Sequence, residues 1–148
     1  MESKLTDLKH RLQEISDLNA ASGVLYWDMS TYMPPGGAPL RGRQLGLLAR
    51  LSHERFTDPA IGRLLDELQS YGESLPYESD DAALIRKTRR DYERQTRLPN
   101  DFVSTLTEHA STTQALWEKA RPANDFTLVR DALEKMLDLS RQLADFFP

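Results

Sequence analysis

Apolar side chains recur at intervals of three or four residues along most of the chain, which is the spacing of one face of a helix. The first such stripe consists of Leu5, Leu8, Leu12, Ile15 and Leu18. A second stripe follows a break of proline and glycine and consists of Leu40, Leu47, Leu48 and Leu51. No run of alternating apolar and polar residues is long enough to indicate a sheet, so the pattern predicts an all-α protein.

Helix start signals divide the next part of the chain into two further elements. The pair Asp58-Pro59 is a typical cap and first position, and the third helix that it opens is expected to end near Gly72. Its apolar stripe consists of Ile61, Leu64, Leu65 and Leu68. Ser79 or Asp80 then caps a fourth helix, which is expected to run to about Arg97.

The remainder of the chain predicts two more helices. Leu98-Pro99 separates the fourth helix from a fifth, because the residue before a proline avoids the helical region. The apolar positions of the fifth are Phe102, Val103, Leu106, Ala110 and Trp117. Asn124 or Asp125 opens the last helix, whose stripe consists of Leu133, Met136, Leu137 and Leu143, with an extension to Phe147. The sequence therefore predicts about six helices in one antiparallel bundle or array that spans residues 1–148.

Composition restricts the kinds of function. The chain has 148 residues, a formal charge of -4 and no cysteine, so disulfides, thiolate metal sites and a cysteine nucleophile are excluded. The negative charge argues against a general surface for nucleic acid or anionic membranes. No apolar run approaches the length of a membrane span, and the first residues lead into an amphipathic pattern rather than a signal segment. We therefore expect no membrane partner and a cytoplasmic location.

The segment Leu25–Gly37 concentrates aromatic residues, a carboxylate and a proline pair between two helical stripes. Pro34-Pro35 keeps the preceding residue out of the helical region, and Gly36-Gly37 permits backbone angles that are closed to other residues, so a helix is expected to stop here. The aromatic side chains are expected to anchor the loop to a core, although such loops also form walls of binding clefts. For Asp28, beside Trp27, two roles stay open: fixing the loop through backbone donors, or contacting a substrate.

The order of residues in this segment resembles a known signature. Trp27-Asp28 is followed by Thr31, Tyr32, Met33, Pro34, Pro35, Gly36 and Gly37, as near the start of the Taq-type thermostable metallocarboxypeptidases. The resemblance continues through Leu45–Leu51, through His53–Pro59, and again at Trp117, Ala120-Arg121 and Asn124-Asp125-Phe126. It spans most of the chain and depends chiefly on the Pro-Pro-Gly-Gly and His-Glu-Arg-Phe-Thr-Asp-Pro runs.

The resemblance implies that a divalent metal, zinc or cobalt, removes the carboxy-terminal residue of a peptide. In the family the two histidines of an H-E-x-x-H helix and a later Glu hold this metal. The motif is absent here: the only His-Glu pair, His53-Glu54, has Thr57 where the second histidine would stand, and His10 and His109 lie far away in sequence. We therefore expect no catalytic residue, no metal ligand and no bound cofactor in this chain, which by itself is predicted to be inactive.

What the resemblance transfers is the helical scaffold that covers and shapes one side of the family's substrate groove. Trp27, Asp28 and Tyr32 are the signature residues expected to face such a groove. Arg90 and Arg94 are further candidates, because a basic stripe along the fourth helix can attract peptide carboxylates. A solvated face paired with acidic neighbours is the more ordinary role of this stripe. Nucleic-acid binding is not expected, because acidic residues interrupt the run and few aromatic residues accompany it.

Three acidic residues have structural roles that account for their positions. Asp58 stands where a helix cap is expected, and Asp125 stands at a helix start, where a negative charge complements the helix dipole. Glu54 lies one helical turn from Arg50 and is predicted to form an ion pair with it.

The function that we expect is therefore the amino-terminal groove wall and scaffold of a metal-dependent carboxypeptidase. The alternative is a stand-alone helical module that pairs with itself or with a separate catalytic partner. Its best feature is the stripe Leu5–Leu18, because near-heptad spacing can also form a seam between chains. The candidate partners are thus a second copy or a missing catalytic half, and peptide is a partner only of a full-length enzyme. The chain is either cut from a longer enzyme or a short natural relative, and Phe146-Phe147 fits a severed core or simple packing of a helix end.

Overall fold

The computed structural model describes residues 1–147 and confirms the all-α class over this range. Its helices are α1 (Glu2–Thr31), α2 (Ala38–Phe56), α3 (Pro59–Ser74), α4 (Asp80–Gln95), α5 (Asn100–Ala123) and α6 (Thr127–Asp145). A short 3-10 helix, η1 (Pro35–Gly37), joins the first two. The predicted number of helices is therefore confirmed for these residues. None of the helices within them is long and apolar enough to cross a membrane.

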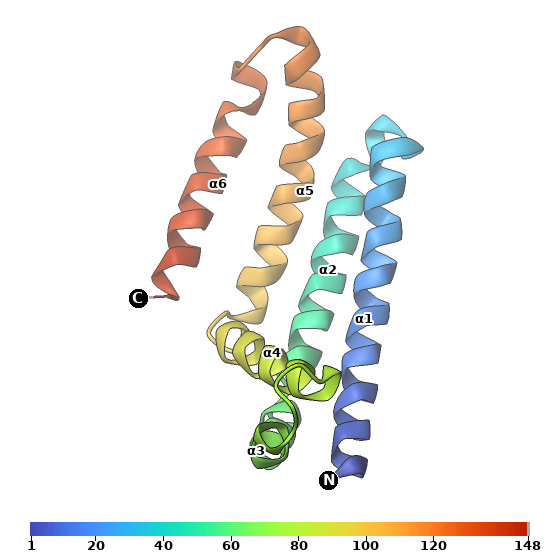
Figure 1. Ribbon diagram of the computed structural model, residues 1–148. Helices are drawn as coiled ribbons and strands as arrows, with labels where there is room; N and C mark the ends of the chain where they lie inside the picture. Colours follow the sequence, from blue (N-terminus) through green and yellow to red (C-terminus); the bar gives the residue numbers. More distant parts are fainter. Residues whose placement is uncertain (148) are drawn as a thin grey trace.

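Four long helices run antiparallel, side by side in the order α1, α2, α5, α6 (Figure 1). The two shorter helices, α3 and α4, pair with each other near the end where the chain starts (Figure 1). The opposite end of the array therefore carries two turns, the one between α1 and α2 and the one between α5 and α6 (Figure 1). Both turns belong to segments that carry the sequence resemblance.

The main hydrophobic core joins α1, α3 and α4. We call it the core cluster, and it consists of Leu5, Leu8, Ile15, Ile61, Leu64, Leu65, Leu68 and Ile85. The predicted stripe of α3 is confirmed here, as is its cap, because an Asp58 carboxylate oxygen accepts a hydrogen bond from the Ala60 amide at 2.7 Å. At α4 the Ser79 hydroxyl accepts from the Ala82 amide at 3.3 Å, so Ser79 caps this helix.

The face that α2 buries differs from the predicted leucine stripe. Leu40 and Leu47 are exposed, whereas Gly42, Leu45 and Gly46 are buried. The reason is close packing against α5: a Cβ atom at position 46 would lie 3.1 Å from the Ser104 carbonyl oxygen. Small residues thus form this contact, so a stripe of large apolar side chains does not indicate which face of α2 is buried.

The stripes of the last two helices are also partly wrong. Trp117 is exposed on α5, where the buried residues are Ser111, Thr113 and Ala120. On α6, Leu137 is exposed, and burial centres on Val129 and Leu139. The main packing partner of α6 is α5, so one narrow face suffices for it. The carboxy-terminal aromatic residues show helix-end packing, because the rings of Phe102 and Phe146 meet edge to face at 5.1 Å.

Buried polar contacts fix the long helices relative to α4. The ring of His53, on α2, lies with its Nδ1 2.6 Å from Asn100 Oδ1 of α5 and its Nε2 3.0 Å from the Gln95 carbonyl oxygen of α4. The Ser52 hydroxyl, on the residue before His53, donates to Asn19 Oδ1 of α1 at 2.8 Å. These bonds satisfy polar groups that would otherwise be costly to bury, and they set the register of α2 against its neighbours.

Candidate functional site

The turn between α1 and α2 begins later than the sequence indicates. Trp27 and Asp28 lie inside α1, which ends at Thr31, so the expectation that they belong to the loop is wrong. The Asp28 carbonyl oxygen accepts hydrogen bonds from the amides of Tyr32 and Met33 at 3.0 and 2.9 Å, and this closes the helix. The restriction that Pro34 places on the preceding residue therefore falls on Met33, after the helix has ended.

The two glycines of the turn do not use the backbone freedom expected of them, because no glycine among residues 1–147 has a positive φ. Gly37 is needed for space instead: a Cβ atom there would lie 2.9 Å from Cγ of Met33. Its amide donates to the Pro34 carbonyl oxygen at 2.8 Å. The Met33 side chain thus folds over the 3-10 turn, and a larger residue at position 37 would displace it.

The aromatic side chains at the end of α1 face solvent. Trp27 is 59% exposed and Tyr32 is 75% exposed, so the expectation that they anchor the loop to a core is wrong for the described residues. Their rings meet edge to face with centroids 5.4 Å apart. We call Trp27, Tyr32 and the turn through Gly37 the aromatic tip. Large aromatic surface left in water near a turn is typical of a surface that contacts another molecule or another part of a longer chain.

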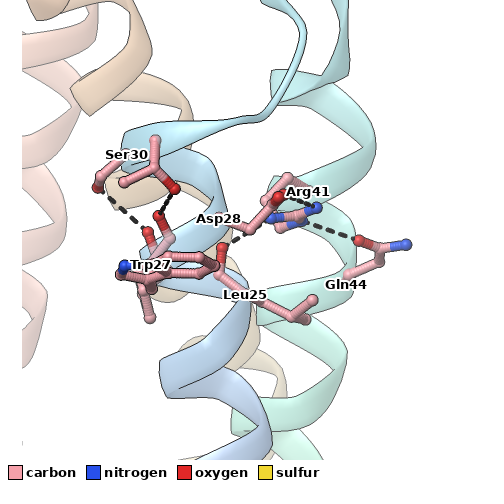
Figure 2. A network of polar contacts seen from close by, with 8 residues as sticks. Leu25, Trp27, Asp28, Ser30, Arg41 and Gln44 are labelled. Carbon is pink, nitrogen blue, oxygen red and sulfur yellow. Dashed lines mark hydrogen bonds and ion pairs between the residues drawn. The ribbon is translucent and has the colours of Figure 1, made fainter.

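A polar clamp attaches the aromatic tip to α2. Arg41 forms an ion pair with the Asp28 carboxylate at 2.7 Å, and its Nη1 donates to the Leu25 carbonyl oxygen, also at 2.7 Å (Figure 2). Its Nε donates to Gln44 Oε1 at 3.1 Å. The Arg41 side chain is only 15% exposed. Asp28 therefore fixes the end of α1 through a side chain of α2 rather than through backbone donors, and its carboxylate is occupied.

The second segment of the resemblance forms the turn between α5 and α6. Asn124 ends α5 in the left-handed conformation at φ 49°, and Asp125 accepts from the Thr127 amide at 2.9 Å, which confirms its place at a helix start. Around the turn lies a cavity of about 260 Å³ lined by Trp117, Ala120, Arg121, Asn124, Asp125, Phe126, Val129 and Leu133. Trp117 and Phe126 are 51% and 63% exposed. This end of the molecule thus presents exposed aromatic residues at both turns (Figure 1).

The structure does not bring Arg90 and Arg94 to the aromatic tip, because α4 lies near the other end of α1 (Figure 1). Arg90 contacts the Asp91 carboxylate at 3.1 Å, and the Arg94 guanidinium lies 5.5 Å from the centre of the Phe147 ring. The hydrogen bond from Lys87, together with that from Arg90, holds the pKa of Asp91 below its ordinary value. This arrangement fits the solvated, paired face, and a role of Arg90 and Arg94 toward peptide stays a prediction.

The histidines do not form a metal site among the described residues. Both ring nitrogens of His53 have protein partners, and His109 Nε2 donates to the Ala132 carbonyl oxygen at 2.9 Å. No group of three potential metal ligands gathers within residues 1–147. Glu54, next to His53, pairs with Arg50 at 2.6 Å as predicted. Within this range the structure therefore assembles no set of three side chains of the kind that holds a zinc or cobalt ion.

Sequence reasoning missed Arg41. It lies beyond the turn from Asp28, in a stretch where Arg41 and Arg43 look alike. Whether Arg41 or Arg43 points toward α1 depends on the angle at which α2 leaves the turn. The local sequence does not indicate that angle. The cavity at the α5–α6 turn was likewise not predicted, although most of its lining residues carry the resemblance.

Comparison with known proteins places these features in a family. The model of the family described as carboxypeptidase Taq (M32) metallopeptidase matches residues 7–147. Thermostable carboxypeptidase 1 of Thermus thermophilus is 33% identical over 135 residues, which cover 90% of this chain and 26% of the relative. Carboxypeptidase 1 of Bacillus subtilis is 23% identical over 136 residues, 92% of this chain and 27% of that relative.

Solved structures match over the same range. The crystal structure of an M32 carboxypeptidase from Deinococcus radiodurans R1 is 39% identical with a TM-score of 0.68, and the match covers 99% of this chain and 29% of that one. A structure of BsuCP superposes with a TM-score of 0.92 at 20% identity, with the same coverage, and this likeness shows the fold alone. The chain thus spans just over a quarter of the length of the curated relatives that it matches.

Proposed function

Because the chain belongs to the carboxypeptidase Taq (M32) metallopeptidase family, we propose that it is the amino-terminal helical part of a metal-dependent carboxypeptidase. In this proposal it forms one wall of the groove in which a peptide lies, and the whole enzyme releases carboxy-terminal residues. The observation that carries the proposal is the aromatic tip: Trp27 and Tyr32 are signature residues, and both are held in solvent.

The contribution of such a wall is binding and exclusion of water. Aromatic faces provide a large contact area for an extended peptide at a small cost in side-chain entropy. Covering one side of the scissile bond also removes water from the site and restricts the orientation of the peptide, and both effects lower the barrier without a bond to the reacting atoms. Trp27 and Tyr32 are the residues to which we assign the contact area, which holds substrate and transition state alike.

The metal site belongs, in this proposal, to the part of the relatives' length that this chain does not match. Within residues 1–147 the three histidines are separated, and His53 and His109 are engaged with carbonyl and amide groups. We therefore assign to this chain no ligand of the metal and no acid or base of the reaction.

The partner that completes the enzyme is the catalytic part of such a carboxypeptidase, and the apolar surface near the α5–α6 turn is its proposed contact. The exposed apolar residues there are Leu116, Trp117, Phe126, Leu128 and Leu133. Large apolar side chains that are exposed near one turn favour an interface with another molecule or another part of a longer chain.

The second candidate function, a stand-alone interaction or dimerisation module, is favoured by the same apolar residues of α5 and α6. The stripe Leu5–Leu18, which was the best sequence feature of this candidate, does not support it, because Leu5, Leu8 and Ile15 lie in the core cluster. Light scattering after size exclusion separates the two candidates. A monomer at all accessible concentrations counts against the module, and a concentration-dependent dimer without any catalytic partner counts for it.

The experiment that tests the proposed function combines an activity assay with metal analysis on one sample. The purified chain is incubated with zinc or cobalt, assayed on a blocked dipeptide, and analysed for bound metal. We expect no turnover and much less than one metal ion per chain. Chelator-sensitive hydrolysis with one metal ion per chain would mean that this chain has its own active site.

A further inference from the structure

We infer that Arg41 is a positioning residue for the aromatic tip, and that it sets how Trp27 and Tyr32 face a bound peptide. The inference rests on the proposed function for its peptide, and on the contacts of Arg41 for its geometry. It assigns a role to a residue outside the signature segment.

The first step is that one guanidinium holds two successive groups of α1. Arg41 contacts the Asp28 carboxylate and the Leu25 carbonyl oxygen, both at 2.7 Å (Figure 2). Hydrogen bonds in which one partner is charged are stronger than neutral ones, and a planar guanidinium fixes the angle between its two partners. Arg41 therefore restrains both the position and the rotation of the last turns of α1.

The second step is that little else restrains these turns. Among the last seven residues of α1 only Met29 is buried, whereas the core cluster holds the other end of the helix. The hydroxyls of Ser30 and Thr31 bond back to carbonyl oxygens of α1 itself, at 3.1 and 2.7 Å, and so these two bonds do not join α1 to a second helix. A helix end with so few buried contacts frays unless a specific bond holds it.

The third step connects the clamp to the aromatic rings. Trp27 directly precedes Asp28 in α1, and Figure 2 shows its indole on the side of α1 that faces away from α2. Tyr32 is attached to the same residue, because its amide donates a hydrogen bond to the Asp28 carbonyl oxygen at 3.0 Å. A rotation of the last turn would thus move both rings together. The clamp on one side of the helix fixes the rings on the other side.

The ordinary alternative is that Arg41 only adds stability. The two roles differ in what they predict, because a purely stabilising contact changes the free energy of unfolding and leaves the interaction with peptide unchanged. A positioning contact changes the Michaelis constant while the turnover number stays nearly constant, since the contact area of Trp27 and Tyr32 holds substrate and transition state alike.

The first test uses the chain itself. The chain has two tryptophans, so Trp117→Phe leaves Trp27 as the only one. In that background Arg41→Ala is compared with Arg41→Lys and with the matched control Arg43→Ala, which removes an exposed arginine of the same helix. We expect Arg41→Ala to lower the fluorescence anisotropy of Trp27 and the hydrogen-exchange protection of the Tyr32 and Met33 amides. Arg43→Ala should match the parent, and Arg41→Lys should be intermediate because an ammonium group lacks the fork.

The second test measures the consequence for peptide. The chain or its variants are mixed with the part of the Thermus thermophilus carboxypeptidase that it does not match, with metal added, and the kinetics are measured on one peptide. We expect Arg41→Ala to raise the Michaelis constant by about threefold or more, with a nearly unchanged turnover number. Arg43→Ala should change neither constant.

Each outcome has one meaning. Unchanged anisotropy and protection in Arg41→Ala would overturn the clamp, and a loosened Trp27 with an unchanged Michaelis constant would overturn its role toward peptide. If the parental mixture has no activity, the proposed function fails, whereas the first test still decides whether Arg41 positions the tip.

Discussion

The two ends of α1 are held in different ways. The first half of the helix contributes Leu5, Leu8 and Ile15 to the core cluster, where apolar side chains from three helices exclude water. The last turns carry Trp27 and Tyr32 in solvent and are joined to α2 chiefly through Arg41. One end is thus stabilised by burial of apolar area, and the other by a few directed polar bonds.

The first half of α1 thus contributes to the stability of the fold, and we propose that its last turns contribute to function. The core cluster accounts for why the chain folds, and most of its side chains lie on the predicted stripes. The aromatic tip adds little burial, yet it holds the residues on which the sequence resemblance chiefly depends. Aromatic rings that face water add little to the stability of this chain, which is why we propose that they contact a peptide or the rest of an enzyme.

The largest effect should come from the core cluster. Leu65→Ala removes a fully buried side chain, and we expect it to lower the free energy of unfolding by about 2–5 kcal/mol. Trp27→Ala should change it by less than about 0.5 kcal/mol, since exposed positions contribute little. Urea unfolding of both variants measures the difference. If Trp27→Ala were the more costly change, the distinction between the two ends would be wrong.

A smaller effect is expected where helices pack through glycine. Gly46→Ala places a Cβ atom 3.1 Å from the Ser104 carbonyl oxygen and 3.3 Å from the Glu108 Cβ atom, so α2 and α5 must separate slightly. We expect a net loss of about 1–2 kcal/mol, which combines overpacking with the gain in helix propensity. Gly23→Ala is the matched control near the aromatic tip, because a Cβ atom at position 23 would have no atom of another part of the chain within 4 Å. It should stabilise the chain by up to about 1 kcal/mol. The midpoint temperature of thermal unfolding should therefore fall in Gly46→Ala and rise in Gly23→Ala.

Two aspartates that accept amide hydrogen bonds at helix starts, Asp58 and Asp125, should differ in how much of the fold their loss destabilises. Asp58→Ala removes the cap of α3 beside the core cluster and should lower the free energy of unfolding by about 1 kcal/mol. Asp125→Ala removes the bond to the Thr127 amide at the opposite end. Since α6 packs mainly on α5, we expect this loss to appear as faster hydrogen exchange within α6 rather than as a shift of the global midpoint. Equal shifts of the global midpoint in both variants would contradict this expectation.

The smallest effect concerns pH. Lys87, through its hydrogen bond, and Arg90 lower the pKa of Asp91 from its ordinary value of 3.8. A depressed pKa in the folded state stabilises the fold above the unfolded pKa, and this contribution disappears as pH falls through the folded pKa. Asp91→Asn should therefore cost less than about 0.5 kcal/mol at pH 6, and the difference from the parent should vanish in acid. Unfolding midpoints at pH 6 and at a series of lower pH values below 3.8 test this, and a cost that grows in acid would refute it.

The sequence allowed prediction of those parts of the fold that depend on local signals. The cap at Asp58 and the stripe of α3 follow from spacing and from one carboxylate, and both are present. The buried face of α2 could not be predicted in this way, because Gly42 and Gly46 pack by being small and have no apolar signal. Leu137 shows the same limit on α6, where one packing partner leaves most of the helix surface exposed.

The sequence indicated which segment forms the candidate site, but it did not indicate how the side chains of that segment are arranged. The order of residues from Trp27 to Gly37 marked its place, whereas the exposure of its rings depends on where α1 ends. The helix continues through Thr31 because proline restricts only the residue before it. The partner of Asp28 depends on the direction of α2 after the turn, which is a tertiary property. Arg41 therefore became visible only in the structure.

The central claim is that this chain supplies a wall of the groove and that a different part supplies the metal site. The most direct measurement compares activity and bound metal in three samples: the chain, the unmatched part of the Thermus thermophilus carboxypeptidase, and their mixture. We predict metal in the second sample and in the mixture, and peptide hydrolysis that increases strongly in the mixture. Stoichiometric metal and hydrolysis in the chain by itself would contradict the account.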